Sequence, residues 1–413
     1  MDFKGMLAVA VACGAFAAGA VEVGNVTARQ RWPWKQLIDV DYEITGAKEG
    51  DMFRIDLTAT PVDGGGSLCA TTFRSEPLGG TGANHVIWDF GADYPELGAT
   101  NLQIAVTATP IRPSNDMYCV IDLSSGPAST KYPVRYTFTG PGHVQGASGE
   151  KCQTTEMWLK RVMNGTYPFH GTDSNKGAGW YKVRISKDLY CGIFECTQQQ
   201  WYQVMGTWPG KFTNELYRAS RPAENIYVTA IIGQHFWPDD KTISDDSFVG
   251  RMRARTGLST FNLPTEGQWE YVCRAGKTQS SLGTPIADYA RNIDNCTEPK
   301  TYNEDTTYGT AFVGSYKANN WGFYDVLGNV AEWVLDSSVG EDALKKLYAK
   351  EIEETGLVTD PIGPPNSAAS STWRHVTRGG NYDNSGGNTS PYARSEYYDP
   401  SPKFGMRFCF TCE

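Results

Sequence analysis

Two carboxylates stand close together in a segment that also contains a glycine. Asp325 and Glu332 are seven residues apart, with Gly328 between them. Glycine lets the backbone turn back on itself, so carbonyl oxygens can join the two carboxylates. Ligands made only of oxygen, on a flexible loop, suit Ca²⁺. The spacing therefore predicts a calcium site; the alternative interpretation is that the two carboxylates only cap turns.

A second group of polar side chains lies near the C-terminal end. Asn381, Asn384 and Tyr392 can offer donors, acceptors and a ring face to a ligand without performing acid–base or metal chemistry. Arg378 and Arg394 flank them. Buried arginines paired with carboxylates hold loops together, so we expect a structural role for these two. The stretch is interpreted as a ligand-binding surface, and no catalytic residue is assigned.

The cysteines leave several disulfide patterns open. The chain has 10 cysteines, and 9 remain if residues 1–20, which include Cys13, are removed. An odd number leaves at least one thiol unpaired. Spacing does not determine connectivity, and the candidate pairs are Cys69 with Cys119, Cys191 with Cys196, and Cys409 with Cys412.

The first twenty residues have the pattern of a secretory signal peptide. Lys4 gives a small positive start, an apolar run follows, and Ala18-Gly19-Ala20 is a small-residue cleavage site. The run is shorter than the ~20 residues that a membrane-spanning helix needs, and no later stretch is long and apolar enough. We therefore expect a secreted or periplasmic protein without a transmembrane segment.

The composition excludes some classes of protein. Hydrophobic residues make up 40% and charged residues 20% of the 413 residues, which is typical of a globular chain. Lys and Arg number 37 against 46 Asp and Glu, and the net charge of −9 offers no basic surface to a phosphate backbone. No nucleic-acid partner is expected.

The elements that must position these residues fall into two halves. Residues 21–140 alternate apolar and polar positions in short runs between turn residues, which predicts an antiparallel, immunoglobulin-like β-sandwich. The Gly-rich stretch 141–151 is interpreted as a linker. Residues 152–413 are rich in Gly and aromatic residues and contain two helix patterns, with Thr197 and Thr265 as N-caps. Together the halves indicate the α+β class.

Five segments of the second half follow one another in an order that is typical of one protein family. They are LYCGIFECTQQQWYQVMG (189–206), FNLPTEGQWEYVCRAG (261–276), WGFYDVLGNVAEW (321–333), HVTRGGNYDN (375–384) and ARSEYYDPSPKFGMRFCF (393–410). With them, residues 152–413 resemble the sulfatase-modifying-factor domain of the formylglycine-generating enzyme family. The resemblance implies a variant of the C-type lectin fold. The β-sandwich resembles the leader domain that precedes such modules in secreted bacterial proteins.

The resemblance also implies two calcium sites. The first would use the side chains of Asp325 and Glu332 with the carbonyl oxygens of Gly328 and Val330. The second would include the Asn292 side chain and the Ile293 carbonyl, with Asp305 as the candidate carboxylate.

Catalysis in this family depends on copper held by two cysteines just after an RGGS-aromatic motif, because thiolates suit Cu(I). In this chain Asn381 replaces the serine, and Asn384 takes the place of the first copper cysteine. No cysteine occurs between Cys296 and Cys409. No copper is therefore expected, and oxidation of cysteine to formylglycine is not supported.

Three functions remain open. The first is a Ca²⁺-stabilised, non-catalytic module that presents loops 295–320 and 381–400 to a glycan or protein ligand. The second is an oxidoreductase with another cofactor, similar to the periplasmic relatives that mature pyoverdine and also lack the copper cysteines. The third is a diversified receptor, because the fold carries variable proteins and the stretch is rich in Asn and Tyr. We favour the first.

Overall fold

The chain folds into two compact units, which are described separately here. One comprises residues up to 116 with the short segment 275–278, and the other comprises the rest. The signal peptide expected at 1–20 lies outside the described residues. No helix in the described parts is both long and apolar enough to cross a membrane. The computed structural model describes residues 21–31, 36–47, 51–75, 77–99, 101–110, 117–170, 180–233, 241–276, 282–283, 285–296, 308–337, 341–364 and 374–412.

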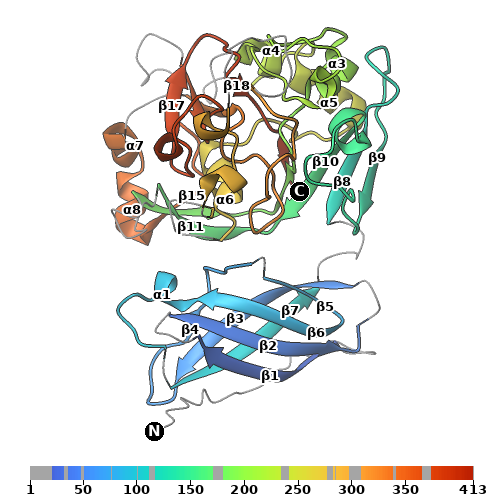
Figure 1. Cartoon of the computed structure of the whole chain (residues 1–413). Coiled ribbons are helices and arrows are strands. Elements are labelled where there is room, and N and C mark those ends of the chain that lie inside the picture. The colour runs from blue at the N-terminus through green and yellow to red at the C-terminus, as the bar shows by residue number, and fades with distance from the viewer. Residues whose placement is uncertain are drawn as a thin grey trace. The chain divides into compact units, whose positions relative to one another are not determined.

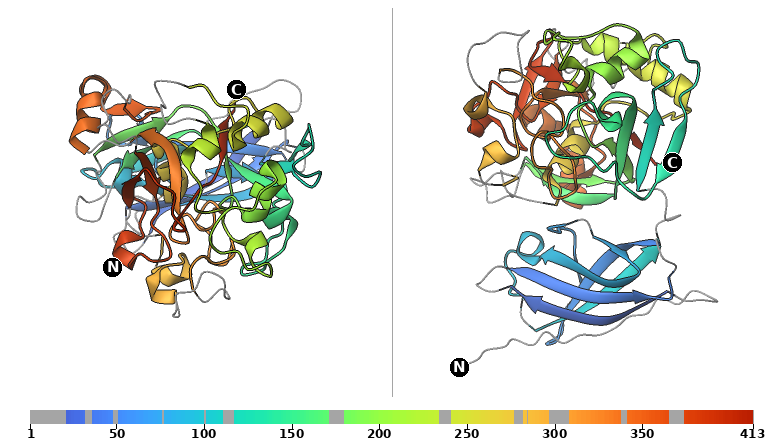
Figure 2. Two further views of the ribbon diagram at one scale, coloured as in Figure 1. Left: turned by 90° about the horizontal axis from the view of Figure 1, so that it is seen from above. Right: turned by 45° about the vertical axis from the view of Figure 1, so that its right-hand side comes forward.

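The first unit is a β-sandwich of two antiparallel sheets (Figures 1 and 2). One sheet has the order β1-β2-β6, and in the other β3 pairs with β4, β5 and β7. Its elements are β1 (Glu22–Gln30), β2 (Leu37–Thr45), β3 (Met52–Pro61), β4 (Leu68–Cys69), β5 (Leu78–Gly80), β6 (Gly82–Asp89), α1 (Phe90–Asp93) and β7 (Leu102–Pro110).

Alternating side chains build the core of this sandwich. Ile55 and Leu57 of β3 are buried, while Asp56 between them is exposed. Such alternation places every second side chain of a strand against the opposite sheet. Val40 of β2 and Val106 of β7 belong to the same core cluster. The predicted period-two pattern is therefore confirmed for residues 21–110.

The described residues of the second unit form three separate sheets. Their strand orders are β19-β13-β10-β8-β9, β11-β12-β15 and β17-β16-β14-β18. The strands are β8 (Tyr118–Asp122), β9 (Val134–Thr137), β10 (Glu156–Val162), β11 (Gly165–Phe169), β12 (Tyr181–Ile185), β13 (Leu189–Gly192), β14 (Ala331–Ser337), β15 (Leu357–Thr359), β16 (His375–Arg378), β17 (Arg394–Tyr397), β18 (Phe404–Gly405) and β19 (Cys409–Thr411).

Short helices and turns surround these sheets, in agreement with the α+β class. The α-helices are α2 (Lys151–Thr154), α3 (Gln198–Met205), α4 (Val228–Ile232), α5 (Phe248–Thr256), α6 (Glu266–Arg274), α7 (Glu341–Leu347) and α8 (Ala349–Thr355). The 3₁₀ turns are η1 (Arg218–Ser220), η2 (Ile286–Asp288), η3 (Ile293–Asn295) and η4 (Gly386–Asn388).

Capping boxes start both helices whose N-caps the sequence predicts. At α3 the Thr197 hydroxyl accepts a hydrogen bond from the Gln200 N–H at 3.2 Å, and Gln200 Oε1 accepts one from the Thr197 N–H at 3.0 Å. At α6 Thr265 and Gln268 repeat this exchange at 3.2 and 3.0 Å. Each box satisfies two N–H groups that would otherwise lack a partner. Both predicted helix starts are confirmed.

The boundary between the units differs from the expected one. We expected the sandwich to reach 140 and a linker to span 141–151, but the division falls between residues 116 and 117. β8 pairs with β10 and β9 pairs with β8, so both strands belong to the second unit. The expected linker also packs there, because Gly149 N donates to Ser220 Oγ at 2.7 Å. A period-two pattern identifies a strand but not the sheet that it joins.

Candidate functional site

Three of the family-like segments lie side by side in the sheet β17-β16-β14-β18. Glu332 of β14 is opposite Arg378 of β16, which is opposite Arg394 of β17. Directly opposed residues point to the same face of a sheet, and their neighbours point to the other face. Bonds from the first face run to α6, whereas Thr377 and Ser395 on the second face line a pocket. The sheet therefore lies between a buried charged layer and a surface pocket, and Arg394 borders both.

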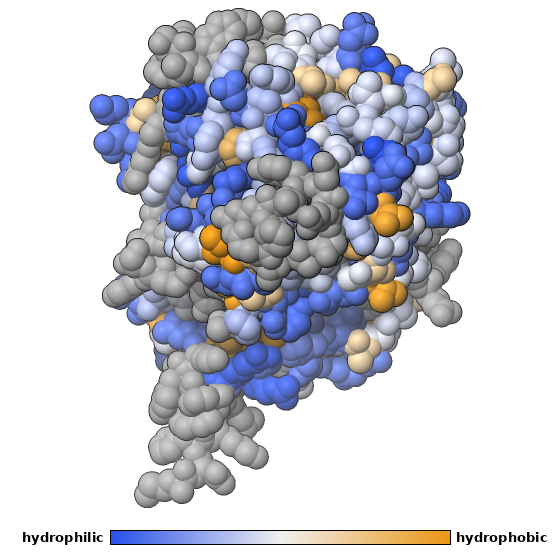
Figure 3. Space-filling view, turned by 45° about the horizontal axis from the view of Figure 1, so that its top comes forward, coloured by the Kyte–Doolittle hydropathy of each residue, from blue (hydrophilic) through white to orange (hydrophobic). Residues whose placement is uncertain are grey.

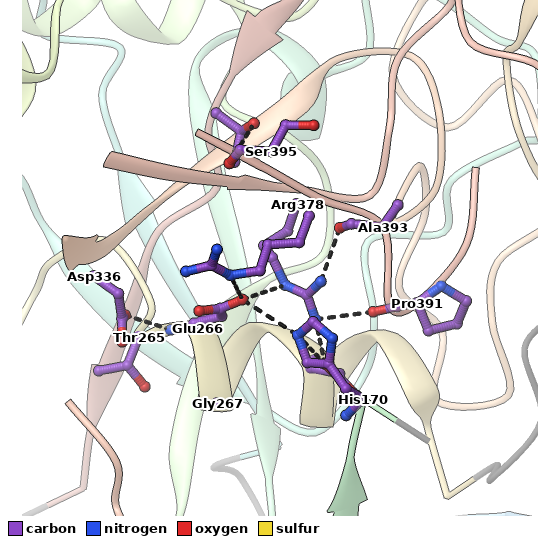
Figure 4. Close-up of polar contacts among 12 residues, drawn as sticks. His170, Thr265, Glu266, Gly267, Asp336, Arg378, Pro391, Ala393 and Ser395 are labelled. Carbon is purple, nitrogen blue, oxygen red and sulfur yellow. Dashed lines mark hydrogen bonds and ion pairs between the residues drawn. The ribbon is translucent and has the colours of Figure 1, made fainter. Parts of the chain in front are cut away.

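A buried ion network joins β16 to α6 (Figure 4). Arg378 has no exposed surface; it is paired with Glu270, and its Nε lies 3.4 Å from Glu266 Oε1. Its terminal nitrogens also donate to the carbonyl oxygens of Ala393 at 2.8 Å and Pro391 at 3.0 Å. These bonds fix the loop that carries both carbonyls at the edge of the pocket. The structural role expected for Arg378 is confirmed.

Arg394 extends this network, because its Nε donates to Glu266 Oε1 at 2.9 Å. Burial alone would raise the pKa of Glu266, but Arg394, His170 and Arg378 together lower the pKa below its ordinary value. Asp336 accepts a bond from the Glu266 N–H at 2.6 Å. Burial, assisted by the charge of Glu266, raises the pKa of Asp336 to about 7. The layer thus holds Glu266, which stays ionised, beside Asp336, which is readily protonated.

The pocket on the other face of the sheet has a volume of about 360 Å³. The three predicted ligand-binding residues, Asn381, Asn384 and Tyr392, all line it. Amides, hydroxyls, aromatic rings and one guanidinium form its described polar lining, in which no thiol, imidazole or carboxylate occurs. Its other lining residues are Ala331, Thr377, Gly380, Gly387, Asn388, Ser390, Ala393, Arg394, Ser395, Tyr397 and Phe404.

Backbone N–H groups fix how the amides of the pocket point. Asn384 Oδ1 accepts from the Asn381 N–H at 2.9 Å, and Asn381 Oδ1 accepts from the Asp383 N–H at 3.0 Å. With both oxygens engaged, the two NH₂ groups are left as donors. Two further groups, Ser390 Oγ and Arg394 Nη2, are buried and make no hydrogen bond within the described chain. The pocket therefore offers mainly hydrogen-bond donors.

Three buried carboxylates surround the loop before β14. Asp325 and Glu332 are 1% exposed, and Glu195 is fully buried. Glu195 accepts bonds from Asn329 Nδ2 at 2.6 Å and from the Val330 N–H at 3.1 Å. Burial, then the charges of Asp325 and Glu332, raise the pKa of Glu195 well above its usual value. Burial also raises the pKa of Asp325 to about 6. Carboxylates in such a group need protons or a cation.

Arg407 neutralises one member of this group. Its Nε lies 2.9 and 2.7 Å from the two oxygens of Glu332, and Trp269 Nε1 donates to Glu332 Oε2 at 2.7 Å. Asp325 differs, because its Oδ2 accepts only from the Gly314 N–H at 2.6 Å, and its buried Oδ1 has no hydrogen-bond partner among the described residues. A buried oxygen in that state fits a bound cation. Of the two predicted carboxylate ligands, Asp325 is thus the one with an oxygen atom that accepts no hydrogen bond from the described residues.

The backbone of this loop turns as the sequence predicts. Gly328 has a φ of 73°, and a Cβ there would lie 2.2 Å from the Arg291 carbonyl oxygen. Asp325 itself has a φ of 52°, which is unusual for a residue with a side chain. Val330 begins the approach to β14 and is 1% exposed. Gly328 is therefore required by both the turn and the close approach.

The second predicted calcium group lies beside the pocket loop. Asn292 is buried and caps η3, with its Oδ1 accepting from the Asp294 N–H at 3.2 Å. Ile293 N donates to the Asn384 carbonyl at 3.1 Å. Asn292 Nδ2 donates to a carboxylate oxygen of Asp294 at 3.2 Å. Asp305, the expected carboxylate partner, lies outside the described residues.

Comparison with known proteins decides the family. Residues 148–411 match the model of the sulfatase-modifying factor enzyme 1-like domain, which covers more than half of the chain. The chain belongs to this family. The relation predicted from the five motifs is therefore confirmed, and the second unit is its sulfatase-modifying-factor domain.

Curated relatives of this domain include a chaperone and several enzymes. Chaperone protein LppX of Paenibacillus barcinonensis is 29% identical over an alignment of 171 residues, and the match covers 35% of this chain and 61% of that protein. The formylglycine-generating enzyme of Thermomonospora curvata is 34% identical over 29% of this chain and 38% of the enzyme. That of Mus musculus is 37% identical over 18% and 22%. The chain thus spans less than two thirds of each relative.

Two solved structures resemble the chain more distantly. Treponema denticola variable protein 1 is 21% identical, with a TM-score of 0.44 over 66% of this chain and 98% of that protein. CarF is 16% identical, with a TM-score of 0.34 over 62% and 99%.

The side chain at the position expected for the first copper ligand is an amide and not a thiol. Asn384, which takes the place of the first copper cysteine, lines the pocket of the sulfatase-modifying-factor domain. None of the nine cysteines of the described residues forms a disulfide in the structure. Cys409 and Cys412 are not among the residues that line the pocket. A soft metal would therefore find amides rather than thiolates in the described lining.

The sequence analysis did not identify two members of this buried charged cluster, the carboxylate Glu195 and its neighbouring guanidinium Arg407. Each is a single charge inside an otherwise apolar motif, FEC and MRF, far along the chain from Asp325. A charge among apolar residues is seldom buried unless it is paired. That mismatch was the available signal, but it does not say which partner each charge meets.

Proposed function

We propose that this chain is an exported, non-catalytic member of the family that binds an acceptor-rich ligand, a glycan or a protein, in the pocket beside β16 and β17. One observation carries the proposal. The pocket presents the amide NH₂ groups of Asn381 and Asn384, the Ser390 hydroxyl and an Arg394 N–H, which make no hydrogen bond among the described residues. Sugar hydroxyls, peptide carbonyls and carboxylates are the acceptors that match such donors.

The absence of acid–base or thiolate groups from the described lining agrees with binding rather than catalysis. Asn384 is a neutral amide that neither removes a proton nor binds a soft metal well. Tyr392 adds a rigid ring and a hydroxyl, which give contact area at low cost in entropy. A protein ligand would also fit the relative LppX, which is named a chaperone protein.

The face shown in Figure 3 supports a polar mode of recognition. Its coloured atoms are mainly hydrophilic, and the apolar groups on it are small and separate. Large continuous apolar patches mark surfaces that bind by the hydrophobic effect. On this face we therefore expect recognition by directed hydrogen bonds.

We further propose that Ca²⁺ stabilises the sulfatase-modifying-factor domain at the loop 325–332. Arg407 offsets one of the three buried carboxylates, and Asp325 Oδ1 has no partner among the described residues. Asp325 and Glu195 are the carboxylates best placed to hold the ion, with the carbonyl oxygens of Gly328 and Val330 as the neutral ligands. Ca²⁺ would supply the positive charge that this group lacks.

The finer fold assignments are part of the same proposal. A C-type-lectin-like arrangement would explain how a domain with few regular elements presents loops around one pocket, and an immunoglobulin-like sandwich would serve as its leader domain. Export follows from the signal-peptide pattern at residues 1–20.

The catalytic alternative is tested with a peptide that carries the CxPxR motif. The full chain is incubated with the peptide, Cu²⁺ and oxygen, and the peptide is examined by mass spectrometry. We expect the peptide thiol to remain intact. Conversion of the thiol to an aldehyde would contradict the proposal. Conversion that persists when Cu²⁺ is left out would favour an oxidoreductase that uses another cofactor.

The binding function is tested with matched tyrosine variants. The labelled full chain is applied to a glycan array and to a peptide array, and the bound fraction is compared with that of Tyr392→Phe and Tyr227→Phe. Tyr392 lines the pocket, whereas Tyr227 is exposed and is not among the lining residues. We expect binding to fall about 3- to 10-fold in Tyr392→Phe, as for the loss of one hydrogen bond, and to be unchanged in the control. Equal binding by all three chains would contradict the pocket assignment.

A further inference from the structure

A histidine, a glutamate and a cysteine from one Gly-rich segment meet at a place distinct from the pocket. One ligating atom each of His143, Glu150 and Cys152 lies within 4.8 Å of the other two. The His143 side chain is 2% exposed and the Glu150 side chain 27%, and Cys152 is 4% exposed. The three therefore form a mostly buried cluster with one side open to solvent.

The hydrogen bonds of His143 leave one ring nitrogen facing an acceptor. Nε2 lies 3.1 Å from the carbonyl oxygen of Gly314, which can only accept, so Nε2 carries a hydrogen. Nδ1 then faces the carboxylate oxygen Oε2 of Glu150 with its lone pair. Two lone pairs in contact repel each other. A cation, either a proton or a metal ion, must therefore lie between these two atoms.

Cys152 favours the metal ion. Its Sγ lies 3.7 Å from the same Glu150 Oε2, so a nitrogen, an oxygen and a sulfur converge on one place. Without a metal ion the Cys152 thiol donates a weak hydrogen bond to this oxygen, and with a metal ion the deprotonated sulfur would be a third ligand. Nitrogen, carboxylate oxygen and thiolate sulfur are together the ligand types of Zn²⁺.

The surrounding structure holds the imidazole in place. Its ring packs edge-on against Phe194 and Tyr324, with ring centroids 4.9 and 5.1 Å apart. Gly314 leaves the room for it, because a Cβ there would lie 2.3 Å from His143 Nε2. The bond from Nε2 to a backbone carbonyl is the outer contact that metal-binding histidines make. The ligand set is thus preorganised.

We propose that His143 Nδ1, Glu150 Oε2 and Cys152 Sγ form a Zn²⁺ site with water as the fourth ligand. The ion replaces the proton between His143 and Glu150 and the proton of the Cys152 thiol, and both protons pass to solvent. No oxidation or reduction takes place. The ion would cross-link the two ends of the segment 143–152, because all three protein ligands belong to it. The site does not depend on the proposed calcium ion, whose ligands are all oxygens.

The test titrates the full chain, stripped of metal by a chelator, with Co²⁺ and then with Zn²⁺ against a chelating dye. Cobalt bound to thiolate gives an intense charge-transfer absorption that other ligands do not give. We expect this absorption in the unmodified chain, one Zn²⁺ per chain, and no displacement by excess Ca²⁺. Cys152→Ser should abolish the absorption and weaken Zn²⁺ binding about 10- to 100-fold or more.

Cys69→Ser is the matched control, because Cys69 is an exposed thiol of the other unit. Glu150→Gln is a second variant that keeps the shape of the side chain and removes its charge, and circular dichroism verifies folding. The proposal is overturned if the unmodified chain lacks the thiolate absorption, if the absorption survives Cys152→Ser, or if Cys69→Ser abolishes it. Should Cys152→Ser not fold, an unchanged Zn²⁺ affinity of Glu150→Gln overturns the proposal instead.

Discussion

Glu332 and Arg407 form an ion pair from which water is almost entirely excluded. Arg407 Nη2 lies 2.6 Å from Glu332 Oε1, and the side chains are 0% and 1% exposed. Arg407 also donates to the carbonyl oxygens of Gly192 and Tyr324 at 3.0 Å each. Ala331, the residue before Glu332, lines the pocket. The pair therefore fixes the strand that forms part of the pocket wall.

Arg407→Met should strongly destabilise the sulfatase-modifying-factor domain. The substitution leaves Glu332 buried without its cation beside Glu195 and Asp325, whose burial already raises their pKa values. Breaking one side of a buried pair costs about 3–5 kcal/mol of unfolding free energy. Chemical denaturation followed by tryptophan fluorescence measures this loss.

The double variant Arg407→Met/Glu332→Leu is the control, because it removes both charges at once. We expect it to be more stable than Arg407→Met alone, since no uncompensated charge remains. If the double variant were as unstable as the sum of both single variants, the two residues would not act as a pair.

The free energy of unfolding should fall as the pH rises from about 4 to about 7, in part because of Asp336. Its folded pKa is raised from 3.8 to about 7 by burial and by Glu266. Between these values the folded chain keeps a proton that the unfolded chain has released, so a higher pH favours the unfolded chain.

Asp336→Asn should flatten this decline, and denaturation midpoints from pH 4 to 7 measure the difference. Glu224, whose pKa burial raises to about 7, contributes with the same sign and should leave a residual slope in the variant. A pH profile identical to that of the unmodified chain would show that Asp336 is not held protonated.

Cys191 and Cys409 should be the pair that forms a disulfide in an oxidising medium. They are direct partners in the β13–β19 ladder. Gly192 N donates to the Phe408 carbonyl at 2.8 Å, and Cys409 bonds to Asn262 on its other side, so the two cysteines are a non-hydrogen-bonded pair. Such pairs have Cα atoms about 4.5 Å apart, within the range of disulfides.

Refolding with oxidised glutathione, which accepts the two electrons and two protons, followed by peptide mapping without reductant measures the pairing. We expect the peptides of Cys191 and Cys409 to be linked. The local pairs considered from spacing, Cys191 with Cys196 and Cys409 with Cys412, should be absent. Finding either of those pairs would contradict the register of the sheet.

A fragment that starts at residue 117 should fold, and one that starts at 150 should not be equally stable. The shorter fragment lacks β8 and β9, which leaves the β10 edge unpaired. It also lacks Ile121 and Tyr132, which belong to the main core cluster. Thermal melting of 117–413 and 150–413 makes the comparison. Equal melting temperatures would place the domain boundary where the sequence suggested it.

Local features of this chain could be predicted from the sequence, because their causes are local. The capping residues Thr197 and Thr265 sit at fixed offsets from Gln200 and Gln268, and the turn at Gly328 needs a positive φ. The candidate pocket could be predicted as well, since Asn381 and Asn384 are neighbours in one turn.

The pairing of segments that are far apart along the chain could not be predicted from the sequence. The strand 134–137 has the same alternation as the sandwich strands but hydrogen-bonds with β8 of the other unit. The stretch around His143 is rich in glycine, and it was interpreted as a linker although its imidazole is buried. Glu195 joins Asp325 only through the fold. Such long-range contacts depend on packing over the whole domain.

Elemental analysis of the purified full chain tests the central claim, that this family member is a Ca²⁺-stabilised binding protein and not a copper oxidase. Mass spectrometry of the metals, before and after treatment with a chelator, is combined with a melting curve of each sample. We expect about one or more Ca²⁺ per chain, no stoichiometric copper, and a lower melting temperature after chelation, because a ligand at a hundredfold excess over Kd adds about 2.7 kcal/mol. Asp325→Asn should remove the part of that sensitivity which added Ca²⁺ reverses. Stoichiometric copper, or a melting curve unchanged by chelation in a chain that contains no calcium, would contradict the account.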